Sequence, residues 1–542
     1  MTFSAAVLPA LQLAAATVLL TGAAILLYLR FFYVDIARVQ GIPEVPGASL
    51  LYGHLRILGD DQPTTMQRWA TQHGWPVFQI RLGNRRVIVL NGFDAARSWL
   101  MANQAHTIDR PRFYTFHGVV SKTSAATIGS NPWDERTKKQ RRVVGSLTTA
   151  PAIRRLVPLV DLETAEMVAA LCDDGQAGAR VLVPHIYEKR LALNVVMMFC
   201  YGRRFDDVRD PLLHQILSDA NVISSFRSTN ANWQDYLPFL RYGVFQDRRR
   251  LRQAAEVRAR RDAWLELLLQ EVRDKIDAGT VGSCVAAGLL TTQDEKLTKG
   301  DVKTILGGLM SGGFETVFST AIAGIAYLAS PAGQVLQEKA YREIIETYGT
   351  TEKAFAQAVS EETCPYMVAF VRETLRHYPP LHLLPPRQTM DAFDWGDAHI
   401  PKGVMILVNT QAANHDTSTY GADADQFRPE RWLKGGAAHD TPAPFQWAFG
   451  AGSRVCTAVS FSNRILYAAF VRLVVTYRIR QGSTAALQPC TDYVGYNRNT
   501  AAQSAIPRDY EATFALRDRV GYEACMARSR DRAQQATNGI VR

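Results

Sequence analysis

The sequence is poor in cysteine and has no low-complexity tract. Its 542 residues include seven cysteines, an odd number spread widely between residues 172 and 525. This spacing excludes a small disulfide-stapled secreted domain and favours a reduced chain that faces the cytosol. With 47% hydrophobic and 21% charged residues, the composition also excludes a disordered or collagen-like protein. The length allows one large domain or several ordinary ones.

Charge of either sign is absent from the first 29 residues. The apolar stretch Ala5–Leu29 is longer than the ~20 residues needed to span a bilayer as a helix. The first basic residues, Arg30 and Arg38, follow this stretch, whereas a cleavable signal peptide has them in front. By the positive-inside rule they keep the following chain in the cytosol. We therefore predict a single-pass anchor over residues 1–33, in the endoplasmic reticulum membrane.

A proline-rich hinge follows the predicted anchor, and no Pro/Gly/Ser-rich linker or solenoid repeat occurs beyond it. Pro43 and Pro46 prevent a continuing helix. We assign residues 34–48 to this hinge and residues 49–542 to one catalytic domain.

The body is predicted to be mainly helical with a minor β-sheet. Residues 77–83 and 86–91 resemble two strands around the turn at Gly83-Asn84, and short strands are expected again within 387–408. Amphipathic periodicity predicts helices at about 150–175, 185–200, 212–226, 246–278, 301–329, 331–347 and 365–378. The arginine-dense run 248–261 is interpreted as a solvated helix face.

The segment Phe449-Gly-Ala-Gly452-Ser-Arg454-Val-Cys456-Thr-Ala458 combines a glycine-rich turn with a cysteine before an apolar helical pattern. Backbone N–H groups at a helix start favour a thiolate, which can act as a nucleophile or a metal ligand. A phosphate loop is disfavoured because no Lys-Ser/Thr follows, and zinc because no second ligand lies at the right spacing. A single thiolate suits an iron held by a macrocycle, whereas a buried structural cysteine is the alternative.

This segment resembles the haem-binding signature of the cytochrome P-450 (haem-thiolate monooxygenase) superfamily. Phe449, Gly452, Arg454 and Cys456 match its fixed positions. Ala448 departs from the proline that usually precedes the phenylalanine. The resemblance implies the cytochrome P-450 fold and haem b, with Cys456 as the axial ligand of the iron.

Two further motifs follow the order of the family. Glu373-Thr-Leu-Arg376 is similar to its Glu-x-x-Arg helix, and Phe427-Arg-Pro-Glu-Arg431-Trp432 to its Pro-Glu-Arg segment. The resemblance implies a buried ion-pair triad of Glu373, Arg376 and Arg431. Taken alone, Glu373 and Arg376 would be an ordinary surface pair.

Paired glycines lie within a long apolar helical pattern, in Gly312-Gly313-Phe314-Glu315-Thr316. Each glycine weakens a helix by about 1 kcal/mol relative to alanine, so a close-lying flat ligand would explain them. A helix-crossing point is the alternative. The segment resembles the oxygen-binding motif of the family, which gives Thr316 and Glu315 the role of proton delivery.

Haem propionates are anionic and need basic or hydrogen-bonding partners. By the resemblance, Arg454, Arg387 and Trp133 take this role. Thr137 stands where the family usually has a basic residue after the tryptophan, and either Arg141 or Arg136 could replace it.

At the level of the branch, residues 223–236 resemble fungal phenylacetate hydroxylases. This implies hydroxylation of a small aromatic acid or phenol, in aromatic catabolism or secondary metabolite biosynthesis, with electrons from NADPH through a membrane-bound reductase. Arg227 would bind a substrate carboxylate, and Leu381, Leu383 and Leu384 would line the pocket, while Lys139 and Arg142 would suit an acidic reductase. The net charge of +10 is then explained by basic residues that contact the haem propionates, an acidic reductase and the membrane surface. No nucleic acid partner is expected.

Two other activities remain open. One is a haem-thiolate isomerase or dehydratase that needs no external electrons, although Glu315-Thr316 argues against it. The other is a cysteine-dependent acyl transfer with His415 or His377 as the base.

Overall fold

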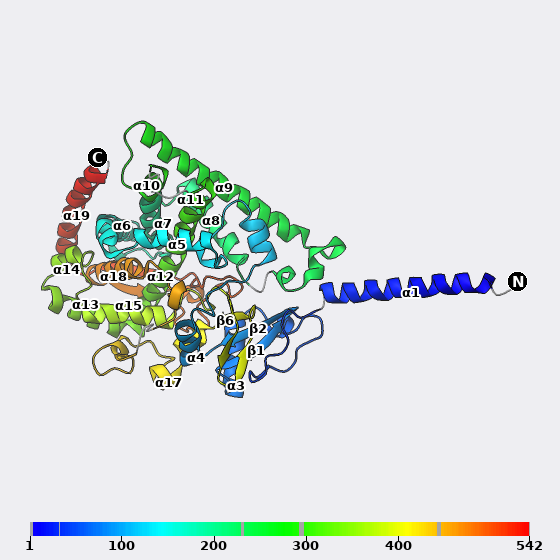
Figure 1. Cartoon of the computed structure of the whole chain (residues 1–542). Coiled ribbons are helices and arrows are strands. Elements are labelled where there is room, and N and C mark those ends of the chain that lie inside the picture. The colour runs from blue at the N-terminus through cyan, green and yellow to red at the C-terminus, as the bar shows by residue number, and fades with distance from the viewer. Residues whose placement is uncertain (1–3, 32, 229–231, 292–296, 442–445, 541–542) are drawn as a thin grey trace.

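An isolated N-terminal helix projects from a large body in the computed structural model, which describes residues 4–31, 33–228, 232–291, 297–441 and 446–540. Helix α1 spans Ser4–Phe31 and extends away from the body (Figure 1). The leucine side chains described between Leu13 and Leu27 are exposed, with Leu19 at 73%. The expected helix is therefore present, and its described apolar side chains do not belong to the core of the body.

The predicted hinge is not a free linker over its whole length. Strand β1 (Val77–Leu82) carries Gln79, whose side-chain amide donates to the carbonyl oxygens of Val39 and Ile42. Val39, Ile42 and Val45 are buried. This part of the hinge is thereby fixed to the edge of the sheet.

The main sheet joins distant parts of the chain in the order β1-β2-β6-β3. Strand β2 (Arg85–Leu90) pairs antiparallel with β1 around Gly83, as predicted, and parallel with β6 (Met405–Val408). Strand β3 (Arg387–Gln388) is antiparallel to β6, so the sheet fixes the position of Arg387. Two small hairpins pair β4 (Phe393–Trp395) with β5 (Ala398–Ile400) and β7 (Tyr477–Gln481) with β8 (Ala512–Leu516).

Helices form the rest of the body, and the predicted ranges agree with them to within a few residues. The long helices are α3 (Gln62–His73), α5 (Glu135–Leu147), α6 (Ala150–Asp174), α7 (His185–Tyr201), α8 (Pro211–Ser225), α9 (Arg248–Asp277), α11 (Lys299–Gly313), α12 (Glu315–Ala329), α13 (Gly333–Tyr348), α15 (Pro365–His377), α18 (Val459–Thr476) and α19 (Arg519–Ile540). The short helices are α2 (Leu55–Leu58), α4 (Phe93–Arg97), α10 (Val285–Thr291), α14 (Thr351–Gln357), α16 (Thr410–Asn414) and α17 (Thr417–Tyr420). The predicted mainly helical fold with minor sheets is confirmed.

The apolar core is centred on α12 and α18, which pack against α6, α7 and α15. By length and hydropathy, Lys299–Ala329 and Val459–Thr476 could each cross a membrane. However, 72% and 78% of their apolar windows are buried in the body, so we interpret both as core helices.

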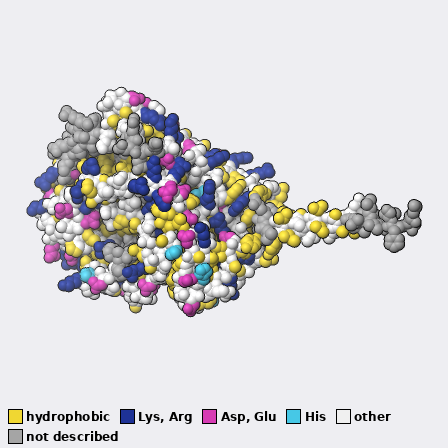
Figure 2. Space-filling view, in the orientation of Figure 1, with side chains coloured by type: hydrophobic (Ala, Val, Ile, Leu, Met, Phe, Trp, Pro, Cys, Tyr) yellow, Lys and Arg dark blue, Asp and Glu magenta, His cyan; other side chains and the backbone are white. Residues whose placement is uncertain are grey.

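The basic run on α9 is only partly solvated. Basic side chains follow the outer edge formed by α9 (Figure 2). Arg261, in contrast, is buried, donates to the carbonyl oxygen of Val120 and pairs with Asp262 at 2.9 Å. The prediction of a uniformly solvated face is therefore wrong at Arg261, which ties α9 to the segment around residue 120.

Candidate functional site

A large internal cavity lies where the Cys456 loop faces the junction of α11 and α12. Its volume is about 280 Å³, and it is also lined by residues of α5 and of the segment 380–387. Segments far apart in the sequence therefore meet around one space that contains Cys456.

Cys456 lies at the end of a tight loop, directly before α18. Its backbone N–H donates to the Phe449 carbonyl oxygen at 3.0 Å, and the Ala458 N–H donates to its Sγ at 3.4 Å. Gly452 has a φ of 60°, and a β-carbon there would collide with the carbonyl oxygen of Leu100. Only glycine fits this position.

The exposed surface of Cys456 faces the cavity, although the residue lies deep in the protein. Burial raises the pKa of its thiol, while the Ala458 N–H and Arg141 act in the opposite direction. A coordinated metal ion deprotonates such a thiol. Among the described residues no group of three or more His, Cys, Asp or Glu side chains could hold a metal.

The departure at Ala448 has a local explanation. The Ala448 N–H donates to Oε1 of Gln446 at 2.6 Å, and proline would lack this donor. The loop after it still places Cys456 at the cavity.

Four arginines converge on the cavity from distant parts of the chain, namely Arg110, Arg141, Arg387 and Arg454. Burial, together with the neighbouring Arg141 and Arg387, lowers the pKa of Arg454 to about 9, and burial with Arg141 lowers that of Arg387 to about 10. Nη1 of Arg454 and Nε of Arg387 and of Arg110 are buried without a hydrogen-bond partner. A concentration of positive charge with free donors indicates an anionic ligand, and haem propionates fit it.

The structure distinguishes between the two basic residues that follow Trp133. Arg141 lines the cavity and donates to the carbonyl oxygens of Ser453 and Val455, both at 3.2 Å. Arg136 instead pairs with Asp301 at 2.6 Å. Trp133 is not among the described residues that line the cavity, and its ring stacks with the Arg454 guanidinium at 4.6 Å. It therefore supports Arg454 from behind.

The paired glycines have separate functions. A β-carbon at Gly312 would meet nothing within 4 Å, because this residue faces the cavity. A β-carbon at Gly313 would lie 2.8 Å from a methyl group of Val196 on α7. Gly313 therefore lies at a helix-crossing point, whereas the flat ligand beside Gly312 stays a prediction. The predicted single helix is interrupted here, since α11 ends at Gly313 and α12 begins at Glu315.

Glu315 and Thr316 both line the cavity. The Glu315 carboxylate accepts a hydrogen bond from Ser504 Oγ at 3.0 Å, and the Thr316 hydroxyl donates to the Gly312 carbonyl oxygen at 2.9 Å. Burial raises the pKa of Glu315, and the charge of Arg227 only partly offsets this rise. The Glu315 carboxyl thus takes up a proton more readily than an exposed glutamate does.

Arg227 lies at the wall of the same cavity, just after α8. Its Nη2 donates to Ser311 Oγ at 3.3 Å, and its Nε is buried without a partner. Burial lowers the pKa of Arg227, and Glu315 is the acidic group that opposes this.

The three leucines divide between two spaces. Leu381 and Leu384 line the main cavity, as predicted. Leu383 lines only a smaller neighbouring pocket, which also contains Arg227, and it packs against the core beneath the sheet.

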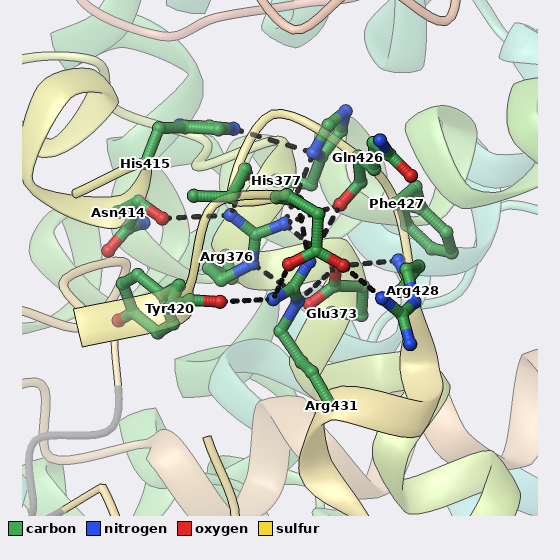
Figure 3. A network of polar contacts seen from close by, with 12 residues as sticks. Glu373, Arg376, His377, Asn414, His415, Tyr420, Gln426, Phe427, Arg428 and Arg431 are labelled. Atoms are coloured by element: carbon green, nitrogen blue, oxygen red, sulfur yellow. Dashed lines mark hydrogen bonds and ion pairs between the residues drawn. The ribbon is translucent and has the colours of Figure 1, made fainter. Parts of the chain in front are cut away.

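The predicted ion-pair triad is present, and its side chains point toward one another (Figure 3). The Glu373 carboxylate receives two hydrogen bonds from Arg376, at 2.7 and 2.9 Å, and one from Arg431 at 3.1 Å. All three side chains are buried. Burial would raise the pKa of Glu373, but the two arginines and further donors keep it below its ordinary value.

Comparison of the sequence with known proteins identifies the family of this chain. The sequence model of the family described as Cytochrome P450 matches residues 43–492. The chain belongs to the cytochrome P450 family. It is therefore a monooxygenase, and the family implies haem with a cysteine thiolate ligand.

Relatives of this P450 include two hydroxylases of Emericella nidulans. Phenylacetate 2-hydroxylase is 36% identical over 93% of this chain and 96% of its own. 3-Hydroxyphenylacetate 6-hydroxylase is 31% identical over 89% and 90%. Cytochrome P450 monooxygenase CYP3 of Mycosarcoma maydis is 30% identical over 80% of both chains.

The histidines proposed for acyl transfer do not serve this P450 as catalytic bases. Neither His377 nor His415 is among the described residues that line the cavity of Cys456. They contact each other at 3.4 Å beside Arg376 (Figure 3). Burial, followed by the charge of Arg376, lowers the pKa of His377 to about 3.

Sequence reasoning missed Arg110. It is buried, donates to the carbonyl oxygens of Pro385 and Pro386, and faces the other three cavity arginines. The only local signal is its place before Pro111, which indicates extended backbone but no ligand.

Proposed function

We propose that this P450 uses haem b to hydroxylate a small aromatic acid or phenol. One observation carries the proposal: Arg227, a buried arginine with an unpartnered Nε, lies in the wall of the cavity that contains Cys456. Arginine binds carboxylates by charge-assisted hydrogen bonds. The names of two relatives, a phenylacetate and a hydroxyphenylacetate hydroxylase, support an aromatic acid.

Bound haem would supply the activation of O₂ and the insertion of one oxygen atom into the substrate. Cys456 would hold the iron, and Arg454, Arg387, Arg141 and Arg110 would hold the propionates. The buried Glu315 carboxyl would carry the proton needed for the reaction, and the Thr316 hydroxyl on the same wall would pass it toward the centre of the cavity. Leu381 and Leu384 exclude water from the aromatic ring.

Electrons would come from NADPH through a P450 reductase. Lys139 and exposed Arg142 on α5 are the basic residues that we assign to the contact with this partner. α5 also carries Arg141, so the contact would lie close to the propionate end of the cavity.

We further propose that α1 anchors the enzyme in the endoplasmic reticulum membrane, with the body in the cytosol. Its 28 residues make a helix of about 42 Å, longer than the roughly 30 Å hydrocarbon core. Its exposed leucines support contact with lipid, and Arg38 lies on the side of the body.

Reconstitution tests this proposal. The full-length enzyme, with reductase and NADPH, is expected to convert phenylacetate or phenol to a product heavier by one oxygen atom, detected by mass spectrometry. Failure with small aromatic acids and phenols alike would contradict the proposal. Turnover without NADPH would indicate the isomerase or dehydratase activity instead.

Replacing Arg227 tests the carboxylate role. Arg227→Ala is expected to weaken phenylacetate binding by about 1.5–3 kcal/mol, which is about tenfold to a hundredfold. Binding of phenol should change little, since it has no carboxylate. Titration calorimetry with both ligands measures the difference, and equal losses for the two would contradict the assignment.

A further inference from the structure

Arg227 and Glu315 are opposite charges that share one buried site without forming an ion pair. Both line the main cavity and also a small pocket behind it. Among the described residues, no nitrogen–oxygen pair between them lies within 4.0 Å. Arg227 donates to Ser311 Oγ, and Ser311 in turn donates to the carbonyl oxygen of Ala126.

Four other arginines line the cavity, but Arg227 is the one whose charge acts on Glu315. Arg261 lines the small pocket with them and is paired with Asp262 at 2.9 Å, and Asp219 is paired with Arg260 at 2.7 Å. Ser504 gives Glu315 a neutral hydrogen bond. Arg227 is thus the only positive group that opposes the effect of burial on Glu315.

Other charged or titratable groups of the packed elements do not line the small pocket that Arg227 and Glu315 share. On α7, Glu188 and Lys189 are not among the residues that line the cavity. His382 and Asp61 line the adjoining pocket with Arg227, and the four propionate arginines line the cavity but not the small pocket. These groups are Glu188, Lys189, His382, Asp61, Arg110, Arg141, Arg387 and Arg454.

A substrate carboxylate bound to Arg227 would bring a second anion to a site with one cation. Two carboxylates that share a buried site do not both stay ionised, so one of them takes up a proton. The substrate carboxylate must stay ionised to pair with Arg227. Glu315 is therefore the carboxylate that takes up the proton.

We propose that binding of an aromatic acid at Arg227 drives the uptake of one proton from solvent onto the Glu315 carboxylate. Substrate binding thereby protonates Glu315 before the reaction begins. This inference rests on the proposed function, because it requires an acidic substrate. A neutral phenol would leave Glu315 unchanged.

Titration calorimetry of the haem-loaded full-length enzyme with phenylacetate tests the inference. Runs in two buffers of different ionisation enthalpy give the affinity and the number of protons taken up, from about pH 5.5 to about pH 8.5. We expect uptake to reach about one proton per bound acid, and the affinity to fall about tenfold per pH unit in that window. Phenylacetamide, the neutral analogue, should bind without proton uptake.

Two variants locate the proton. Glu315→Gln is expected to bind phenylacetate without uptake, whereas Glu188→Gln, a buried glutamate outside the cavity, should retain the full uptake. Binding without uptake by the unmodified enzyme overturns the inference and leaves the proposed function intact. Uptake that persists in Glu315→Gln also overturns it, because the substrate itself then carries the proton. Absence of phenylacetate binding contradicts the proposed aromatic acid itself.

Discussion

At the scale of single residues, Cys456 combines two properties that one side chain rarely has. It lies deep in the protein, yet its sulfur faces open space in the cavity. Two features hold it there: the glycine-rich loop and the start of α18, which donates the Ala458 N–H to it. The position therefore presents one ligand to one face of a flat group.

Replacing this sulfur tests its role as the iron ligand. Cys456→Ser is expected to lose the absorption band of the reduced, CO-bound thiolate haem, because a hydroxyl does not replace the thiolate. Cys490→Ser, at a half-buried cysteine outside the cavity, serves as the control and should keep the band. If Cys456→Ser keeps it as well, another residue must hold the iron.

A second residue makes a prediction about pH. Both carboxyl oxygens of Glu188 are buried without a partner, and burial raises its pKa from 4.5 to about 8. The folded state therefore binds more protons than the unfolded state between these pH values, so stability falls as the pH rises through this window. Glu188→Gln should remove this dependence, since the amide does not ionise.

Urea denaturation at about pH 5 and at about pH 8 measures this effect. The stability of Glu188→Gln relative to the unmodified enzyme is expected to increase with pH, by up to about 1.4 kcal/mol per unit. Exposed Glu346→Gln is the control and should follow the unmodified enzyme. Parallel curves for Glu188→Gln would contradict the prediction.

At the scale of elements, the break between α11 and α12 serves both the cavity and the packing. Gly312 leaves space on one side, and Gly313 allows α7 to approach on the other. A continuous helix with larger residues would close the cavity or push α7 away. The two glycines weaken the helix, but the space at Gly312 and the close approach at Gly313 require residues without a side chain.

Substitution separates the two glycines. Gly313→Ala is expected to destabilise the fold by about 1–3 kcal/mol, because its methyl group would overlap Val196. The cost should be smaller in a Val196→Ala background, which a double-mutant cycle measures. Gly312→Ala is the matched control: its methyl group enters the cavity, so the thermal midpoint should not fall. An equal loss at both positions would contradict this division.

At the scale of the whole molecule, the body does not depend on α1 for its core. None of the described apolar clusters includes a residue of α1. The helix projects from the body (Figure 1) and exposes its described leucines. The proposed anchor can therefore be removed without changing the core of the body.

Deletion of residues 1–33 tests this separation. The truncated enzyme is expected to bind haem with an unchanged spectrum and to move to the soluble fraction after an alkaline wash. A full-length Leu19→Lys/Leu20→Lys variant is the control, since each lysine at a helix centre costs roughly 2.5–3.5 kcal/mol of insertion. Retention of the truncated enzyme in membranes would show that α1 is not the sole anchor.

The sequence alone determined the features that depend on local spacing. The Cys456 loop, the Glu373-x-x-Arg376 turn of α15, the hairpin at Gly83 and most helix ranges follow from neighbours in the chain. Glycine conformation, helix periodicity and capping are set by interactions over a few residues. For this reason the family, the position of Cys456 in its loop and the helical fold were predictable.

Only the tertiary structure decided which distant residues meet. Arg110 and Arg387 approach the same cavity from sites 277 positions apart in the sequence, and Arg141 rather than Arg136 joins them because of how α5 is turned. Leu383 points to the neighbouring pocket, His377 and His415 belong to the ion network, and Arg227 shares a wall with Glu315. Such convergence depends on how the whole chain packs around its core, and local propensity carries no information about it.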